Sequence, residues 1–396
     1  MSDSKKIVAL AQLDLAEGLA DGRIDRRSFV RNALALGLAL PSIAAVLQAC
    51  GGSEPEAPAK PPEGAAAVDA QPAGPPDLGE MEKELKICNW SDYIAEDTIA
   101  NFEKETGIKV TYDTFESNEE LIGKLQAGAT GYDLVCPSGY AVQVLLAIGL
   151  LEPLRPKYLT NLGNVAPQFR KTAFDPTDAH SVPWQWGMTG IAFRKDKVKA
   201  VPDSWAVFHD PQYKGKLTMM DDMRDVIGAW LKFRGKSVNS VVPEELAAAK
   251  ADALVAKALL QSYVSAPVKG QLVAGDVWIA QLWNGDTLQA KVENDQIDWI
   301  LPKEGGVIWC DSMVMPKGAP NKRAAHAFLD YILRPEVGAS ISDATGYGSP
   351  NAAATAKMKV PVAYPSDEQM KLLEFQADLA GASAAWDQIW TEIKAG

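Results

Sequence analysis

The feature of this sequence that most constrains its fold is an alternation of short apolar segments and helix-like segments across residues 85–136. In chain order, the predicted elements are a strand at 85–88, a helix at 96–106, a strand at 108–115, a helix at 117–127 and a strand at 132–136. Gly107 and Gly128 stand where the two helices should stop, and Ser117 opens a capping-box sequence. Strands that alternate with helices in this way form parallel sheets, so we predict an α/β fold.

Polar and aromatic side chains gather where the first and third of these strands end. The residues concerned are Trp90, Ser91, Asp92 and Tyr93 after the first strand, and Ser138 and Tyr140 after the third. In parallel α/β sheets, ligands bind outside the carboxyl ends of the strands. The sequence therefore predicts a binding site at this edge of the sheet.

The second half of the chain continues the α/β pattern and indicates a second unit. Its predicted elements are strands at 190–194 and 216–222, a helix at 243–262, apolar stretches at 276–286 and 298–316, and helices at 322–333 and 367–394. Segments that cross between the two units predict two lobes with a cleft between them. We expect lobe 1 to comprise 84–186 plus 312–365, and lobe 2 to comprise 187–311 plus 366–396.

The N-terminal segment is typical of an export signal rather than of the folded domain. Arg26 and Arg27 precede an apolar run that ends in Leu-Gln-Ala-Cys50, which resembles a lipobox. The alternative is a membrane-spanning helix, but the apolar run is about 16 residues and a span needs about 20. We expect 1–50 to be a Tat-type lipoprotein signal peptide with Cys50 lipidated. A disordered tether rich in Gly, Ala and Pro should follow at 51–83, and the protein should be membrane-anchored in the periplasm or at the cell surface.

Composition and spacing exclude several classes of function. The net charge is −12 without basic runs, so nucleic acid is not expected as a partner. No Cys or His spacing indicates a metal site, and no cofactor is expected. A disulfide between Cys88 and Cys136 is conceivable, with buried free thiols as the alternative. An exported hydrolase is disfavoured because no nucleophile–base motif is present, so we do not expect an enzyme.

Acidic and aromatic residues recur together at several predicted strand ends. The groups are Trp90 with Asp92 and Tyr93, Trp283 with Asp286, Trp309 with Asp311, and the acids Asp222 and Asp225. Unpaired carboxylates are costly to bury, and Arg224 is the one basic residue within these stretches. If the groups converge, a ligand should supply the missing positive charge. An ammonium over an indole ring gains about 0.5–2 kcal/mol of cation–π energy.

Nearly the whole chain after the tether resembles the periplasmic spermidine/putrescine-binding proteins of ABC importers. The resemblance is carried, in order, by NWSDYIAEDTIANFEKETGIKVTYDTFESNEEL, YDLVCPS, PQYKGKLTMMDDMRDV, LWNGD, PKEGGVIWCDSMVMP, LRPEV, TGYGSPN and WTEIKAG. It implies a type II periplasmic-binding-protein fold with two α/β lobes, crossover strands and a ligand cleft. It also implies an extracytoplasmic protein that binds a polyamine and delivers it to the permease subunits of an ABC importer.

The resemblance assigns ligand-binding roles to particular positions. They are Trp90, Ser91, Asp92, Tyr93, Ser138, Tyr140, Asp222, Asp225, Trp283, Asp286, Trp309, Asp311 and Tyr347. Asp311 should bind an inner or terminal amine, with Asp92 and the Asp222/Asp225 pair at the two ends. The alternatives are that Asp222 only ends a strand, that Asp286 caps the following segment and that Tyr347 only packs.

Two questions of ligand and role stay open at the level of sequence. Asp92, where spermidine-preferring members often have Glu, favours putrescine, whereas the DDMRD stretch that holds Asp222 and Asp225 resembles the spermidine type. Thr391 also stands where some members have a ligand-contacting Gln. A monomer is expected. A polyamine-sensing protein that serves a membrane receptor is the alternative to transport.

Overall fold

A mixed sheet of ten strands organises the part of the chain that the structure describes. The computed structural model describes residues 77–128, 131–265, 267–362 and 364–396. The chain divides into two units, 1–73 and 74–396, and all described residues belong to the second. The predicted signal peptide with Cys50, and the tether as far as residue 76, lie outside the described residues. Within the described ranges, no helix has the length and apolar character needed to cross a membrane.

The predicted β-α-β-α-β series is confirmed at the start of the described chain. Its elements are β1 (Glu84–Trp90), α4 (Thr98–Thr106), β2 (Lys109–Phe115), α5 (Asn118–Gln126) and β3 (Leu134–Val135). Strand β1 pairs in parallel with both β2 and β3. The Ser117 hydroxyl accepts a hydrogen bond from the Glu120 amide at 3.1 Å, so it caps α5 as its sequence indicated. The carboxyl ends of β1 and β3 therefore meet at one edge of the sheet.

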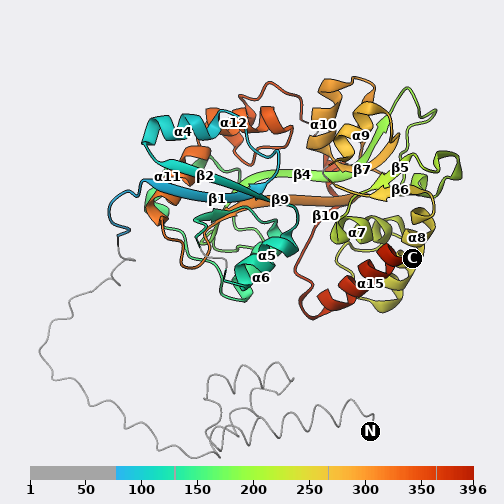
Figure 1. Cartoon of the computed structure of the whole chain (residues 1–396), viewed down its shortest axis with the longest axis horizontal. Coiled ribbons are helices and arrows are strands. Elements are labelled where there is room, and N and C mark those ends of the chain that lie inside the picture. The colour runs from blue at the N-terminus through green and yellow to red at the C-terminus, as the bar shows by residue number, and fades with distance from the viewer. Residues whose placement is uncertain (1–76, 129–130, 266, 363) are drawn as a thin grey trace, which may run out of the picture. The chain divides into compact units, whose positions relative to one another are not determined.

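Two long strands, β4 (Ser181–Arg194) and β9 (Gly306–Val314), join the two halves of this unit. They pair with each other in antiparallel fashion and are buried along their whole length. Figure 1 shows both strands running through the middle of the sheet, with helices on either face. The strand order is β2-β1-β3-β9-β4-β7-β5-β6, with β8 on β4 and β10 on β9. The strand predicted at 190–194 thus begins much earlier, at Ser181.

The remaining elements complete the two halves. They are α6 (Gly139–Ala147), β5 (Leu217–Met219), α7 (Met223–Phe233), α8 (Pro243–Lys257), β6 (Leu260–Tyr263), α9 (Val268–Ala274), β7 (Ile279–Trp283), α10 (Asn284–Glu293), β8 (Ile297–Ile300), α11 (Lys322–Ile332), α12 (Pro335–Thr345), α13 (Ala352–Thr355), α14 (Asp367–Met370), β10 (Leu373–Phe375) and α15 (Ser383–Ala395). Short 3-10 helices lie at Pro156–Tyr158, Leu162–Asn164, Pro167–Phe169, Trp205–His209, Pro211–Tyr213 and Ala380–Ala382.

Two predicted helices are wrong because part of each forms a strand that pairs with a distant strand of the sheet. The helix predicted at 243–262 ends at Lys257, and the following residues form β6, which pairs in parallel with β5. The helix predicted at 367–394 is interrupted by β10, which pairs in parallel with the start of β9. Helices α6, α7, α9, α10, α12 and α13 were not foreseen. In each case the sequence propensity is weaker than the hydrogen bonding and packing that the neighbouring strand or helix offers.

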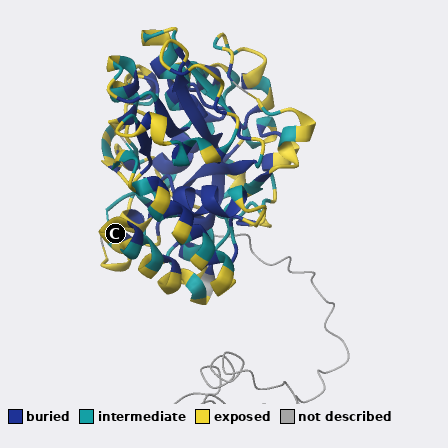
Figure 2. Cartoon of the chain, turned by 90° about the vertical axis from the view of Figure 1, so that its right-hand side faces the viewer, coloured by how far each residue is buried: buried dark blue, intermediate teal, exposed yellow. Residues whose placement is uncertain are grey.

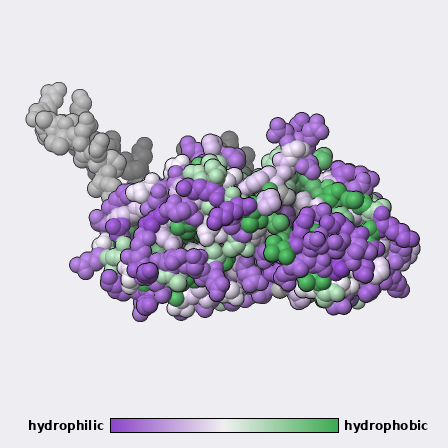
Figure 3. Space-filling model, turned by 90° about the horizontal axis from the view of Figure 1, so that it is seen from above, coloured by the Kyte–Doolittle hydropathy of each residue, from purple (hydrophilic) through white to green (hydrophobic). Residues whose placement is uncertain are grey.

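Buried side chains form one large cluster around β1, β3, β4 and β9 and a second around α7, α8 and α15. Figure 2 shows the buried strands at the centre, with exposed residues on the outer helices and loops. Much of the face seen in Figure 3 is hydrophilic. Cys88, Cys136 and Cys310 are free and buried, so the disulfide considered for Cys88 and Cys136 does not form. These cysteines serve as small apolar groups of the core.

Candidate functional site

A cleft in this unit collects the acidic and aromatic residues that the sequence singled out. It is lined by Trp90, Ser91, Asp92, Tyr93, Glu116, Asn118, Ser138, Asp222, Asp225, Ser265, Lys269, Trp283, Asp286, Trp309, Asp311, Tyr347 and Gln376. It encloses about 860 Å³ free of protein atoms, including its open mouth. Every predicted ligand-binding residue except Tyr140 lines this cleft.

Tyr140 lies beside the cleft and has protein partners. Its hydroxyl donates a 3.0 Å hydrogen bond to Glu119 Oε1. The guanidinium of Arg224 lies 4.9 Å from the centre of its ring and 5.0 Å from that of Trp386. Arg224, the one basic residue within the acidic stretches, therefore stacks between two aromatic rings. It does not line the cleft.

The carboxyl end of β1 supplies one wall of the cleft. Trp90 is held in place because its indole Nε1 donates a 2.9 Å hydrogen bond to the carbonyl of Cys136. The chain then turns at Asp92, whose φ of 52° lies in the left-handed region that Asp adopts more readily than most residues. The Asp92 side chain is 80% exposed, so it stands at the rim of the cleft.

Strand β9 supplies the floor. Trp309 and Asp311 are two residues apart on one strand, so their side chains project from the same face. Gly187 of β4 lies opposite Trp309 in the register, and a Cβ at Gly187 would stand 2.6 Å from the Trp309 ring. The glycine therefore lets the indole lie directly against the backbone of β4, which brings both Trp309 and Asp311 into the cleft.

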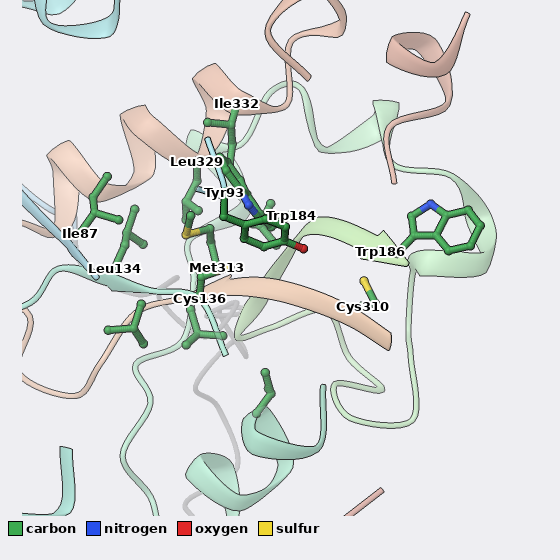
Figure 4. Packing of buried hydrophobic residues seen from close by; sticks show 14 of the residues in the cluster. Ile87, Tyr93, Leu134, Cys136, Trp184, Trp186, Cys310, Met313, Leu329 and Ile332 are labelled. Carbon is green, nitrogen blue, oxygen red and sulfur yellow. The ribbon is translucent and has the colours of Figure 1, made fainter. Parts of the chain in front are cut away.

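Three aromatic rings surround the carboxylate of Asp311. The ring centres of Trp309 and Tyr347 are 5.1 Å apart, and those of Tyr93 and Tyr347 are 5.3 Å apart, both with edge-to-face geometry. Figure 4 shows Tyr93 beside Trp184, with its hydroxyl turned away from the aliphatic side chains of Ile87 and Leu134. The aromatic faces offer apolar walls to the alkyl part of a ligand.

Asp311 is a buried carboxylate without a counter-charge among the described residues. It is 5% exposed, and its Oδ1 atom has no hydrogen-bond partner there. Burial raises its pKa to about 7, against the smaller lowering effects of Ser138 and Tyr93. The Trp309 indole nitrogen is also buried without a partner in the described chain, and the Tyr93 hydroxyl faces Asp311 closely enough to lower its pKa. Buried polar atoms of this kind are available to hydrogen-bond a polar or charged ligand.

A second acidic group lies at the start of α7. Asp222 caps this helix, because its Oδ1 accepts a 2.9 Å hydrogen bond from the amide of Asp225. Asp225 in turn accepts hydrogen bonds from the Thr189 hydroxyl at 3.0 Å and from the Trp283 indole at 3.2 Å. Burial raises the pKa of both carboxyls, and their mutual repulsion raises that of Asp222 further. Asp222 thus caps α7 and also lines the cleft.

Five lining residues were not foreseen from the sequence: Glu116, Asn118, Ser265, Lys269 and Gln376. Glu116 and Asn118 follow β2 and could have been found by the same strand-end rule as Asp92. Lys269 lies on α9 and carries no local signal. Its ammonium group lies 3.5 Å from Asp92 Oδ2, so the cleft contains a basic side chain that the acidic stretches of the sequence did not reveal.

The fold and the cleft together are those of a known class of protein. Two α/β halves joined by long strands, with an acidic, aromatic cleft, form a type II periplasmic-binding-protein fold. The described residues contain no group of three or more His, Cys, Asp or Glu side chains that could hold a metal ion. The family model for bacterial extracellular solute-binding proteins matches residues 97–371, and the chain belongs to that family.

Within this family, the chain is similar to proteins that are named for polyamine binding. The chain is 36% identical to the spermidine/putrescine-binding periplasmic protein of Escherichia coli (strain K12), over 79% of this chain and 92% of that protein. It is also 36% identical to the putrescine-binding periplasmic protein PotF of the same strain, over 81% and 93% of the two chains. The crystal structure of the Tp0655 (TpPotD) lipoprotein of Treponema pallidum superposes with a TM-score of 0.74, at 30% identity, and covers 78% of this chain and 99% of its own.

Proposed function

We propose that this protein binds linear polyamines in the cleft and delivers them to an ABC importer. The observation that carries the proposal is the buried carboxylate of Asp311, which has an unpartnered oxygen and stands among Trp309, Tyr93 and Tyr347. A ligand ammonium would complete the hydrogen bonding of this carboxylate, at a gain of about 1.5–3 kcal/mol per charged hydrogen bond. The rings would pack against the methylene chain. The names of the relatives support the same ligand class.

The charges in the cleft favour a cationic ligand over an anionic one. Its acidic lining residues are Asp92, Glu116, Asp222, Asp225, Asp286 and Asp311, whereas Lys269 is the one basic residue that lines it within the described chain. An anion site would need Arg side chains or free helix N-termini, and here the N-terminus of α7 is already capped by Asp222. None of the three histidines of the chain lines the cleft, so an exported hydrolase would have no histidine base there.

We further propose that the two halves act as lobes, 84–186 plus 312–365 and 187–311 plus 366–396. The cleft lining supports this division because Asp92 and Tyr93 belong to the first set, whereas Asp225 and Trp283 belong to the second. A ligand that contacts both sets would favour the closed arrangement of the lobes. The permease subunits would then bind the closed form of the protein in preference to the open form. The role requires no catalysis and no cofactor.

The N-terminal segment supports a proposal about location. Residues 1–50 would be a Tat-type lipoprotein signal peptide that leaves the mature protein anchored through a lipid on Cys50. Residues 51–83 would form the tether between the membrane and the binding domain. A lipoprotein is named among the similar solved structures, which supports this arrangement. We propose a monomer that works in the periplasm or at the cell surface.

Calorimetry tests the proposed function directly. Purified full-length protein would be titrated with putrescine, cadaverine, spermidine and spermine, and its thermal unfolding would be followed with and without each. We expect saturable heat with at least one polyamine and a higher unfolding temperature in its presence, because a ligand that binds only the folded state stabilises that state. The absence of both effects with all four compounds would rule the proposal out.

A further inference from the structure

Lys269 places an ammonium group inside an otherwise acidic cleft. It stands near the start of α9, with 23% of its side chain exposed, and lines the same space as Asp311 and Asp225. Its Nζ atom donates a 2.8 Å hydrogen bond to Gln289 Oε1 and lies 3.5 Å from Asp92 Oδ2. The lysine therefore reaches from α9 towards the rim residue at the end of β1.

The position of this ammonium is set by a chain of hydrogen bonds. The amide nitrogen of Gln289 donates to the carbonyl of Thr345 at 2.7 Å, which turns its Oε1 atom towards Lys269. The Thr345 hydroxyl bonds in turn to Gln185, and Gln185 lies opposite Asp311 in the register of β4 and β9. Gln289 is thus linked through Thr345 to the central strand β4, and its hydrogen bond holds the ammonium of Lys269 at one end of the cleft.

The acidic residues of the cleft fall into an order that leads away from Lys269. Asp92 is within 3.5 Å of its ammonium, and the charges of Lys269 and Asp92 both act on the pKa of Asp286, less strongly than burial and Tyr347 do. Tyr347 donates a hydrogen bond to Asp286, and its ring packs against that of Trp309, two residues from Asp311. The Asp222/Asp225 pair lines the cleft from α7, and Asp225 is the acid whose charge raises the pKa of Asp311.

Among the described residues that line the cleft, the far end of this series has no cation. Arg224 is adjacent in sequence to the Asp222/Asp225 pair, and its charge lowers the pKa of both carboxyls, less strongly than burial raises it. Its guanidinium, however, donates to the carbonyl of Ala377 at 3.0 Å and to Asn239 Oδ1 at 2.9 Å, outside the cleft lining. Lys269 thus places an ammonium inside the cleft within ion-pair distance of Asp92, whereas Arg224 acts on the α7 acids from outside the lining.

We propose that Lys269 acts as a built-in terminal ammonium and makes the cleft selective for diamines over longer polyamines. The inference rests on the proposed polyamine-binding function. The two ammonium groups of a diamine would take the positions at Asp311 and at the Asp222/Asp225 pair. The next ammonium of a longer polyamine would be directed towards Asp286 and Asp92, where it would meet the positive charge of Lys269 at close range.

The same contacts argue against an alternative role for Lys269 as an anchor for an anionic group of the ligand. Asp92 lies within ion-pair distance of its ammonium, and Gln289 already accepts one of its hydrogen bonds. Asp286 adds a further carboxyl nearby. A ligand carboxylate at this end would face more negative than positive charge, so an amino acid with an ω-ammonium is a poorer match than a plain diamine.

Calorimetry on full-length protein tests the proposal by the ratio of two dissociation constants, spermidine over putrescine. In the wild type we expect putrescine to bind more tightly. Lys269→Met and Lys269→Gln should lower the ratio by at least about tenfold, because the position at Asp286 and Asp92 becomes free for a third ammonium. Lys269→Arg keeps the charge and should keep the preference for the diamine.

A matched control separates this local effect from the general gain in cation affinity that follows the loss of any positive charge. Lys291 lies on α10, as Gln289 does, and pairs with Asp298 at 3.0 Å away from the cleft lining. Lys291→Met removes the same charge and should leave the ratio unchanged. A wild type that prefers spermidine, or a ratio that does not move in the neutral Lys269 variants or moves equally in Lys291→Met, overturns the inference.

The design also separates the two proposals. If the wild type binds none of the polyamines, the proposed function fails, and the inference fails with it. If the wild type binds polyamines but Lys269 does not affect the ratio, only the inference fails. Thermal unfolding curves establish that each variant is folded, and the wild-type preference is decisive even without the variants.

Discussion

The hydroxyl of Tyr347 donates a 2.6 Å hydrogen bond to Asp286 Oδ1, and this contact closes one side of the cleft. The two residues come from a loop after α12 and from the first turn of α10. Their approach depends on Gly285, since a Cβ there would stand 2.4 Å from the Tyr347 ring. One glycine thus permits an aromatic wall and a carboxylate to share a site.

Gly285→Ala should displace Tyr347 and weaken both the fold and ligand binding. Overpacking of this kind costs about 1–3 kcal/mol, so we expect a lower unfolding temperature and an affinity loss of about tenfold. Gly270→Ala on α9 is the control, because a Cβ there would meet no atom within 4 Å. That variant should be neutral or slightly more stable. Equal behaviour of the two variants in thermal unfolding and calorimetry would contradict the role given to Gly285.

Tyr347→Phe should weaken polyamine binding most strongly at low pH. The hydrogen bond from Tyr347 lowers the pKa of Asp286, which burial raises, so its loss lets Asp286 hold its proton to higher pH. The affinity loss should therefore be larger at about pH 6 than at about pH 8. Tyr132→Phe is the control, because it removes a hydroxyl bonded to Asp113 outside the cleft lining. A pH-independent loss in Tyr347→Phe would show that the hydroxyl does not act through the protonation of Asp286, and unchanged affinity would show that the ring alone matters.

Asp311→Asn should lower polyamine affinity by at least about tenfold. The substitution removes the charge from the hydrogen bond that we assign to a ligand ammonium, while it keeps the shape of the side chain. The unliganded protein should not lose stability, because a buried carboxylate without a counter-charge is itself unfavourable. Asp298→Asn on β8 is a surface control outside the cleft lining. Unchanged calorimetric affinity in Asp311→Asn would remove this residue from the site.

The pH dependence should have opposite signs for stability and for binding. The pKa of Asp311 is about 7 in the folded protein against 3.8 for an ordinary Asp, so between these values the folded state holds a proton that the unfolded chain has released. The contribution of Asp311 to the stability of the unliganded protein therefore falls as pH rises through this window. Polyamine affinity should rise through about pH 7, because the ligand needs the ionised form. Unfolding temperatures and titrations at about pH 5.5 and about pH 8 measure both trends, and Asp311→Asn should reduce them.

Cys50→Ala should release the protein from the membrane. If Cys50 carries the lipid, its loss removes the anchor and leaves the binding domain in the soluble exported fraction. Fractionation of cells that express either form, followed by immunoblotting, measures the distribution. Ligand affinity of the released protein should be unchanged. Continued membrane attachment of the variant would contradict the lipobox interpretation.

Sequence alone was sufficient for the features that depend on local order along the chain. The parallel arrangement of β1, β2 and β3 follows from strands that alternate with capped helices. The position of Trp90 and Asp92 at the edge of the sheet follows from the end of β1. Trp309 and Asp311 lie on one face because side chains alternate along a strand. Such patterns need only neighbours in sequence, so they can be recognised without the fold.

Only the tertiary structure decided the features that depend on partners far apart in the chain. Residues 260–263 and 373–375 became strands because β5 and β9 offered hydrogen-bonding edges, which no local propensity records. Lys269 entered the cleft because Gln289 and the central strands direct its side chain there. Arg224 stayed outside the lining because Tyr140 and Trp386 lie on either side of its guanidinium. The sequence thus predicted the rings of the cleft and all of its acids except Glu116, while long-range contacts determined which cation faces them.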